Sequence, residues 1–190
     1  MRVLKWLCQT FPLTAEDART FNNAALRLAC MNGHLDVCKY LQHHFQLGIE
    51  DARADHHFAL RWSCDRGHLP VLIWLRDTFN LGPQDASLIN LRSLLRLACG
   101  KGNLDICKFL HHTFHFSVDD VRSPDNGPFR WACEYGHLSC CKWLYETFGL
   151  TKEDARAYNN YVLRYAKQNC RTDVLEWLKT TFHLDEEDDG

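Results

Sequence analysis

A period of about 34 residues runs through the whole sequence and constrains its fold more than any other feature. A pair formed by an aromatic residue and a leucine recurs from Trp6-Leu7 to Trp177-Leu178, in steps of 34, 34, 35, 34 and 34 residues. An aspartate recurs with the same steps from Asp17 to Asp188. A repeat of this length buries its apolar face only against its neighbours. The sequence therefore predicts one array over residues 1–190, with a half repeat at 1–21 and full repeats at 22–55, 56–90, 91–124, 125–158 and 159–190.

Each repeat has the pattern of two helices joined by a tight turn. Apolar residues recur at helical spacing in 25–30 and again in 35–45, and Gly33 between them can take the left-handed conformation that ends a helix. We expect Asn22 or Asn23 to cap the first helix through its side chain. A third segment starts at an N-cap residue such as Thr14 and has an aspartate three residues later, which predicts a short helical turn. No segment alternates with period two, so an all-α fold is expected.

Composition excludes several classes of protein. The formal net charge is −2, with 46% hydrophobic and 24% charged residues, which fits a folded soluble protein rather than one with a basic nucleic-acid arm. No apolar run approaches the ~18 residues of a spanning helix, and Lys5 interrupts the apolar N-terminus, which makes it a poor signal peptide. The ten cysteines follow the repeat. We interpret them as reduced cysteines of a cytoplasmic protein.

The repeat resembles the ankyrin repeat family. The segment ALRLACMNGHLDVCKYL (25–41) has that family's helix and Gly-His turn, and it recurs at 60–75, 95–110 and 129–144, with a weaker copy at 163–178 that carries Cys170 in place of the turn glycine. The pattern F-x-L-T-x-E-D-A-R replaces the family's β-hairpin finger, as in the divergent repeats of giant DNA viruses of amoebae and of amoebal genomes. The resemblance implies an ankyrin-like solenoid of stacked helix-turn-helix repeats. Tetratricopeptide repeats are rejected, because Gly33 separates two helices instead of lying inside one.

Cysteine and histidine form two motifs with the spacing C-x3-H-x3-C. They comprise Cys30, His34 and Cys38, and Cys133, His137 and Cys141. Zinc requires such groups to converge tetrahedrally, but the same stripe positions hold leucine or lysine in other repeats and the third repeat has Asn103 in the histidine column. We therefore interpret the cysteines as small buried apolar residues and the turn histidine as a hydrogen-bonding spacer. No metal or cofactor is expected. The histidine runs at 43–44, 56–57 and 111–115 are interpreted as solvated, two of them at helix ends.

An arginine column departs from the pattern of the family. Arg27, Arg61, Arg96, Arg130 and Arg164 stand where the family has histidine. Together with the aspartate column they are expected to form bidentate ion pairs between neighbouring repeats. Binding of phosphate or an acidic peptide is the alternative. The aromatic columns from Trp6 to Trp177 and from Phe11 to Phe182 are expected to lie in the core.

The predicted function is that of a non-catalytic scaffold that binds a partner protein. One interpretation is a viral protein that engages a host factor in the host cytoplasm. No catalytic constellation or phosphate-binding loop is found in the sequence. Residues before the turn glycine differ between repeats, and the family resemblance implies binding there and just before the first helix, on a concave strip. These partner-binding candidates are Asn23, Met31, Asn32, His57, Asp65, Arg66, Arg92, Lys101, Asn126, Glu134, Tyr135, Asn160, Gln168 and Asn169. A Cys/His metal-binding or redox-responsive module is the alternative from a different class.

The N-terminal segment has the pattern of a second helix without a first helix before it. Val3, Trp6 and Leu7 belong to the column that elsewhere packs against a first helix. An exposed apolar patch would mark a contact site, so we expect weak self-association through this edge or a chain that is a fragment of a longer array. Cys8 lies in a column of polar residues and is expected to be the most exposed thiol.

Overall fold

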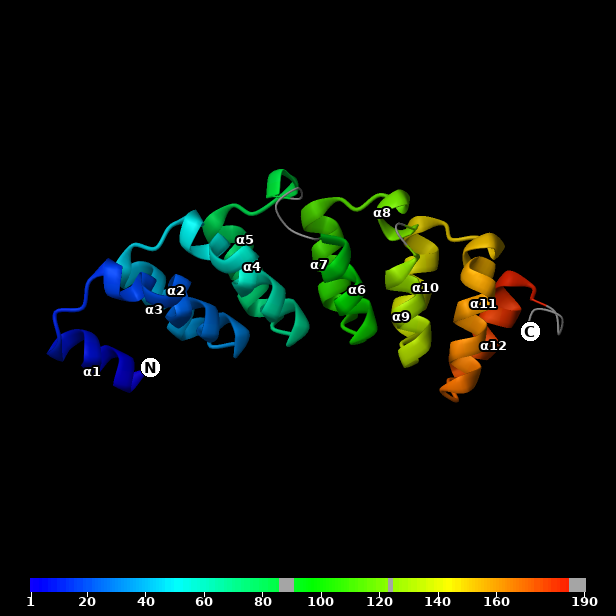
Figure 1. Ribbon diagram of the computed structural model, residues 1–190, viewed down its shortest axis with the longest axis horizontal. Helices are drawn as coiled ribbons and strands as arrows, with labels where there is room; N and C mark the ends of the chain where they lie inside the picture. Colours follow the sequence, from blue (N-terminus) through cyan, green and yellow to red (C-terminus); the bar gives the residue numbers. More distant parts are fainter. Residues whose placement is uncertain (86–90, 123–124, 185–190) are drawn as a thin grey trace. The chain divides into compact units, whose positions relative to one another are not determined.

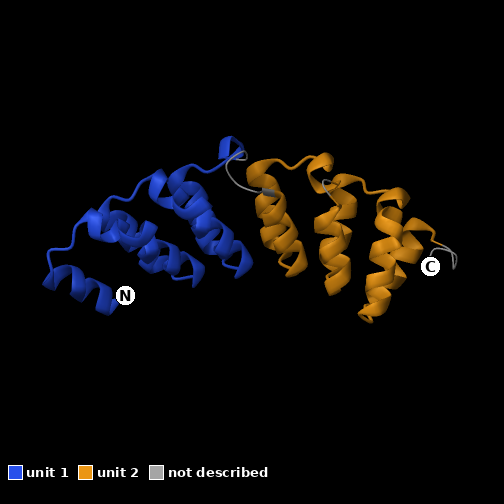
Figure 2. Cartoon of the chain, in the orientation of Figure 1, with its two compact units in different colours: residues 1–89 blue, residues 90–190 orange. Residues whose placement is uncertain are grey.

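The computed structural model describes residues 1–85, 91–122 and 125–184, and every regular element within these ranges is helical (Figure 1). The expected all-α fold is confirmed. The chain divides into two compact units, residues 1–89 and 90–190 (Figure 2). The single array over 1–190 and its repeat boundaries stay predictions.

Both units are built from helix pairs joined by the tight turns that the sequence predicts. Unit 1 contains α1 (Arg2–Thr10), α2 (Ala15–Met31), α3 (Leu35–Phe45), α4 (Ile49–Asp65), α5 (Leu69–Phe79) and the short 3-10 helix η1 (Pro83–Asp85). Unit 2 contains α6 (Leu91–Gly100), α7 (Leu104–Phe114), α8 (Val118–Arg122), α9 (Gly127–Tyr135), α10 (Leu138–Phe148), α11 (Lys152–Gln168) and α12 (Thr172–Phe182).

The helices of each unit form two layers. In unit 1 the first helices α2 and α4 contact each other, and so do the second helices α3 and α5. In unit 2 the first-helix layer runs through α6, α9 and α11, and the second-helix layer runs through α7, α10 and α12. Contacts within each repeat join the two layers, as between α6 and α7. Figure 1 shows the helix pairs of each unit following one another in chain order.

A left-handed link separates the short helical turn from the first helix. Within α2, Phe21, Asn22 and Asn23 have φ of 52°, 57° and 59°, and residues 55–57 of α4 and 158–160 of α11 repeat this geometry. Asn, Asp and His enter this region more readily than other residues with a side chain, and they fill most of these positions. The expected side-chain cap at Asn23 is wrong. Its Oδ1 is buried without a hydrogen-bond partner, because the residue is left-handed rather than in the extended conformation of a side-chain cap.

The aspartate column closes the predicted capping boxes. Thr14 and Asp17 exchange hydrogen bonds between side chain and backbone, and so do Thr151 and Asp154. This geometry starts the short helical segment that follows, so the predicted third segment of the repeat is confirmed.

The core lies between the layers and between successive repeats. The leucines of the aromatic-Leu pairs in the full repeats, from Leu41 to Leu178, are almost completely buried. The phenylalanines from Phe45 to Phe182 are buried as well. In the half repeat, however, Trp6 and Phe11 are exposed, so the expectation that they lie in the core is wrong. No first helix within the described residues covers this face of α1.

Candidate functional site

The residues just before each turn lie at the end of a first helix and largely face solvent. Asn32, Arg66, Lys101 and Tyr135 are exposed, as are Gln168 and Asn169, while Met31, Asp65 and Glu134 are half-buried. Tyr135 keeps 45% of its surface exposed. Next to these side chains, the framework cysteines Cys30, Cys64, Cys99 and Cys133 are completely buried. Each unit therefore presents its own set of variable side chains, which we call the turn-end residues.

Of the five candidates before the first helix, the structure buries three. Asn23, His57 and Asn126 are buried, so the expectation that they lie on an exposed strip is wrong. The Asn23 side chain hydrogen-bonds Asp51 in the helical turn that follows, and Asp85 of the next such turn lies near His57. Arg92 is exposed and pairs with Asp120 at 3.5 Å, and Asn160 is half-buried.

His57 occupies an unusual environment. Its Nδ1 is buried without a hydrogen-bond partner. Burial lowers the pKa of His57, and the nearby Arg53 and His56 act in the same direction, whereas Asp85 and Glu50 oppose them. The neutral imidazole is therefore the favoured form in the folded protein.

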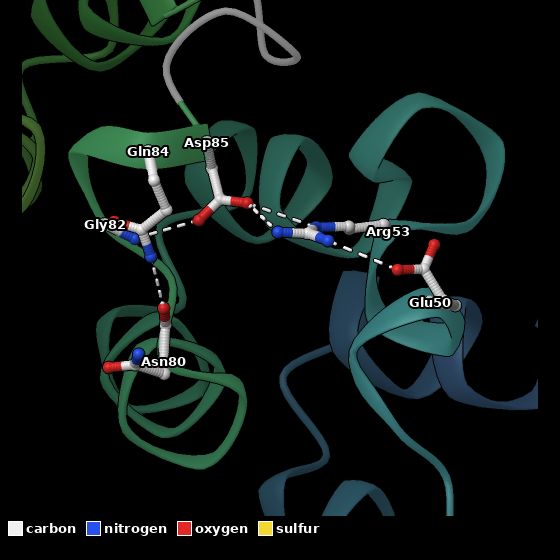
Figure 3. Close-up of polar contacts among 6 residues, drawn as sticks. All are labelled: Glu50, Arg53, Asn80, Gly82, Gln84 and Asp85. Atoms are coloured by element: carbon white, nitrogen blue, oxygen red, sulfur yellow. Dashed lines mark hydrogen bonds and ion pairs between the residues drawn. The ribbon is translucent and has the colours of Figure 1, made fainter.

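An inter-repeat clamp surrounds Asp85, which is completely buried (Figure 3). Its Oδ2 accepts a hydrogen bond from the Gly82 backbone N–H at 3.0 Å. Its Oδ1 accepts from Arg53 Nε of the preceding repeat at 3.1 Å and from Arg53 Nη2. Arg53 also reaches Glu50 at 3.2 Å, and Gln84 Nε2 donates to the Asn80 carbonyl at 2.7 Å. The clamp joins the two repeats of unit 1, and its function is structural.

The same clamp recurs at Arg19–Asp51 and at Arg122–Asp154, each with two N–H···O bonds of 2.8–3.1 Å. Burial opposes ionisation of Asp51, but the Arg19 guanidinium, the Gly48 N–H and the Asn23 amide together hold its pKa below the ordinary value. The pKa of Asp154 is lowered in the same way against burial, by Arg122 and Thr151. Arg19 and Arg53 close the E-D-A-R motif, and Arg122 closes its variant D-D-V-R. Their 34-residue spacing, interrupted only by Ser at position 87, was the signal that could have identified them.

The other arginine column does not form the expected ladder. Arg27 pairs with Asp55 at the end of its own repeat and lies over Phe58 of the next one. Arg61 is exposed, and Arg130 pairs with Asp125 of its own repeat at 2.8 Å. The prediction that this column forms ion pairs between repeats is therefore wrong, and the pairs between repeats are formed by Arg19, Arg53 and Arg122 instead. Most of these guanidiniums stack on aromatic rings instead, which is a favourable cation–π arrangement.

Unit 2 gathers aromatic side chains on its first-helix layer. Arg96 lies over Trp131 at 4.7 Å, and Trp131 meets Tyr135 edge to face at 6.0 Å. Tyr161 lies between Arg130 at 3.7 Å and the parallel ring of Tyr165 at 4.0 Å. We call Trp131, Tyr135, Tyr161 and Tyr165 the aromatic cluster. Sequence reasoning identified only Tyr135 among them.

The turn histidine is the spacer that the sequence predicts. His137 Nε2 lies 2.9 Å from the carbonyl oxygen of Gly100 in the preceding repeat. A Cβ built on Gly102, which has φ +70°, would lie only 2.5 Å from His137 Nδ1, and one on Gly33 would meet His68 in the same way. The turn glycine is therefore required both by its backbone and by its neighbour.

The cysteine motifs do not form a metal site. The sulfurs of Cys30 and Cys38, and those of Cys133 and Cys141, are 3.5 Å apart, but His34 is exposed and His137 faces Gly100. Across the described residues, no group of three or more His, Cys, Asp or Glu side chains could hold a metal ion. Burial and the hydrogen bond with Cys141 raise the pKa of the Cys133 thiol. The geometry therefore gives no support to the metal-binding alternative.

Two further expectations are wrong: that the histidine run at 111–115 is solvated throughout, and that Cys8 is the most exposed thiol. His43, His44 and His112 are exposed as expected, but His111 is half-buried against Trp143 and Phe148. Burial lowers the pKa of His111, with a smaller contribution from His115. Cys8 is half-buried beside Tyr40, whereas Cys170 is exposed. Cys170 replaces a turn glycine at φ 55°, and this position lies at the surface.

Comparison with known families agrees with this geometry. A family model described as ankyrin repeats (3 copies) matches residues 95–188. A search of curated proteins found no match. The matched residues lie within unit 2, and the helix pairs of unit 1 have the same two-layer packing. Among the described helices, none has both the length and the apolar character needed to cross a membrane.

Proposed function

We propose that this chain is a non-catalytic scaffold that binds a partner protein through its turn-end residues. Ankyrin repeats are generally protein-interaction modules, and in repeat proteins the surfaces that differ between repeats serve binding. The observation that carries the proposal is the contrast within one helix: Tyr135 is exposed, whereas Cys133, two residues earlier, is completely buried. Asn23, His57 and Asn126 are left out of the proposed surface because they are buried.

The chemistry of the turn-end residues supports a protein partner. Arginine and tyrosine are enriched among residues that contribute most to protein–protein binding, and Arg66 and Tyr135 are both exposed. Arg66 lies over its own Trp62 at 5.6 Å, which restricts its side chain before binding. A restricted side chain loses less conformational entropy when a partner arrives.

Two variants test the proposal and separate the units. Asn32→Ala with Arg66→Ala removes turn-end residues of unit 1, and Lys101→Ala with Tyr135→Ala removes those of unit 2. Glu134 stays unchanged, because its carboxylate accepts a hydrogen bond from Tyr161 at 2.8 Å. We expect at least one variant to lose capture of a partner from lysate, while its unfolding free energy changes by no more than about 0.5 kcal/mol.

The matched control is Lys108→Ala with Lys142→Ala, which changes exposed residues of the second helices. It should retain the partner. If both turn-end variants capture the partner as well as wild type does, the proposed surface is wrong. The resemblance to repeats of giant viruses supports a viral protein that engages a host factor in the host cytoplasm, and partner identification in amoebal lysate tests that proposal.

We also propose weak self-association through the N-terminal edge. Val3, Trp6, Phe11 and Leu13 are exposed there, and Phe21 nearby is 86% exposed. Exposed apolar patches of this kind tend to mark contact sites, and a second copy offers a matching apolar face. Light scattering over a concentration series should show a rise in mass that Trp6→Glu abolishes. A constant monomer mass would contradict the proposal.

A further inference from the structure

Charge is unevenly divided between the two helix layers of unit 2. The first-helix layer with its turn ends (residues 91–101, 127–135 and 161–169) has six cationic side chains and one carboxylate, Glu134. Its cations are Arg92, Arg96, Lys101, Arg130, Arg164 and Lys167. The second helices have Lys108, Lys142 and Lys179 against Asp105, Glu146, Asp173 and Glu176. The first-helix layer is thus cationic in a chain whose formal net charge is −2, and it favours an anionic partner.

Two guanidiniums of this layer have no carboxylate partner in the part of the chain that the structure describes. Arg96 stacks on Trp131, and its Nε is buried without a hydrogen-bond partner. Arg164 donates from Nε to the Asn159 carbonyl at 2.8 Å. Arg130, by contrast, is paired with Asp125. Arg96 and Arg164 therefore retain terminal N–H groups that can bind an added carboxylate.

The aromatic cluster favours a peptide over a nucleic acid. Single-stranded nucleic acids bind by stacking bases on open aromatic faces. Here Trp131 is covered on one face by Arg96, and Tyr161 is enclosed between Arg130 and Tyr165. Tyr135 meets Trp131 edge to face and remains substantially exposed. The cluster therefore offers guanidinium edges and one apolar anchor rather than a platform for bases.

We propose that the partner presents an acidic peptide segment to unit 2, with carboxylates bound by Arg96 and Arg164 and an apolar side chain against Tyr135. This inference rests on the proposed function, since it uses the same layer, and it names the chemistry of the partner. Arg96 on α6 and Arg164 on α11 are two repeats apart. With about 8–10 Å between packed helices and about 3.3 Å per extended residue, the two acidic positions lie roughly five to six residues apart.

Panning a random-peptide display library on the full chain tests the inference. The recovered peptides should be enriched in Asp and Glu at that spacing, and their binding should weaken with salt. Charged hydrogen bonds of this kind correspond to a loss of about tenfold or more in affinity when one is removed, so Arg96→Gln with Arg164→Gln should bind at least that much more weakly. Lys108→Gln with Lys142→Gln removes the same charge from the second helices and should bind normally.

Binding of the selected peptides to the single variant Arg164→Gln is also measured. This control is needed because Arg96 contacts Trp131, so that replacing Arg96 can disturb packing. Peptides without acidic enrichment, an empty selection, or unchanged binding to Arg164→Gln would overturn the inference. So would competition of a labelled oligo-dT strand with the selected peptides. If neutral peptides are recovered and the Lys101→Ala/Tyr135→Ala variant loses them, the proposed function stands and the acidic partner is wrong. If acidic peptides bind this variant normally, Lys101 and Tyr135 do not belong to the binding surface.

Discussion

Helices α1 and α5 have nearly the same apolar pattern but differ in burial. Val3, Trp6 and Phe11 are 69%, 56% and 48% exposed. Their counterparts Val71, Trp74 and Phe79 are 1%, 9% and 6% exposed. Helix α5 packs against α4 and α3, whereas α1 has no fully buried residue. The comparison shows that in this protein the neighbouring helix, rather than the local sequence, decides whether an apolar stripe becomes core.

The largest expected loss of stability comes from truncating the leucine at one equivalent position of the two helices, Leu72 in α5 and Leu4 in α1. Leu72 is completely buried, so Leu72→Ala should lower the unfolding free energy by about 2–5 kcal/mol through lost burial and a cavity. Leu4→Ala, at the equivalent but half-buried position of α1, should cost less than about 1 kcal/mol. Urea denaturation of both variants measures the difference. Equal losses would mean that α1 is packed as firmly as α5.

The polar clamps extend the comparison. Asp85 is completely buried and Arg53 is mostly covered, whereas Arg19 of the first clamp is 44% exposed. Arg53→Ala should cost about 2–4 kcal/mol, because it leaves a buried carboxylate without its cation. Arg19→Ala should cost less than Arg53→Ala, because solvent screens that pair. A larger loss for Arg19→Ala in urea denaturation would reverse this ranking.

Two glycines with positive φ allow the cost of backbone strain to be measured separately from the cost of a clash with a neighbouring side chain. Gly33 and Gly149 both have positive φ, at 71° and 59°, but only Gly33 has a neighbouring side chain where a Cβ would lie. Gly149→Ala should cost about 1 kcal/mol from strain alone. Gly33→Ala should cost more, because His68 must move. If thermal melting shows the same shift for both variants, contact between the repeats contributes nothing at this turn.

His57 makes unit 1 sensitive to acid. Its pKa is lowered by burial, so the unfolded chain binds the proton more readily than the folded one. The stability contributed by the neutral ring is complete above the ordinary pKa of about 6.5 and is lost as pH falls through the lower folded value. The equivalent residue of the preceding repeat is Asn23, so His57→Asn is a conservative replacement. It should make the unfolding free energy less dependent on pH below about 6.5. An identical pH profile in both proteins would contradict this.

The smallest effect concerns thiol accessibility. Cys8 on α1 is half-buried beside Tyr40, and Cys170 is exposed. Cys170 should therefore react first with an alkylating reagent, and Cys170→Ser should remove the fast phase. Mass spectrometry of partly alkylated protein locates the first modified site. Earlier modification of Cys8 would show that α1 detaches from α3.

Much of the fold could be predicted from the sequence because the repeat carries it. The 34-residue step, the turn glycines and the capping aspartates are local or periodic signals. The helices and short turns lie where these signals predict them. The clamp arginines were also readable, since Arg19, Arg53 and Arg122 keep the period. The column of Arg27 is equally periodic, but its partners are aromatic rings rather than a continuous row of carboxylates, and periodicity alone does not separate the two columns.

The helix pairs, the turns and the place of the turn-end residues along each helix could be predicted without a structure, because they depend on spacing along the chain. At Asn23 and His57 three successive left-handed residues direct the side chain inward, in a way that helical periodicity cannot express. Asn126 is buried as well, and in all three cases the burial is a result of the tertiary structure. It also decided that Trp6 stays exposed while Trp74 is buried, and that Arg96 stacks on Trp131. Burial and pairing are properties of neighbours brought together by folding, and a repeat that looks the same in sequence has different neighbours at different places in the chain.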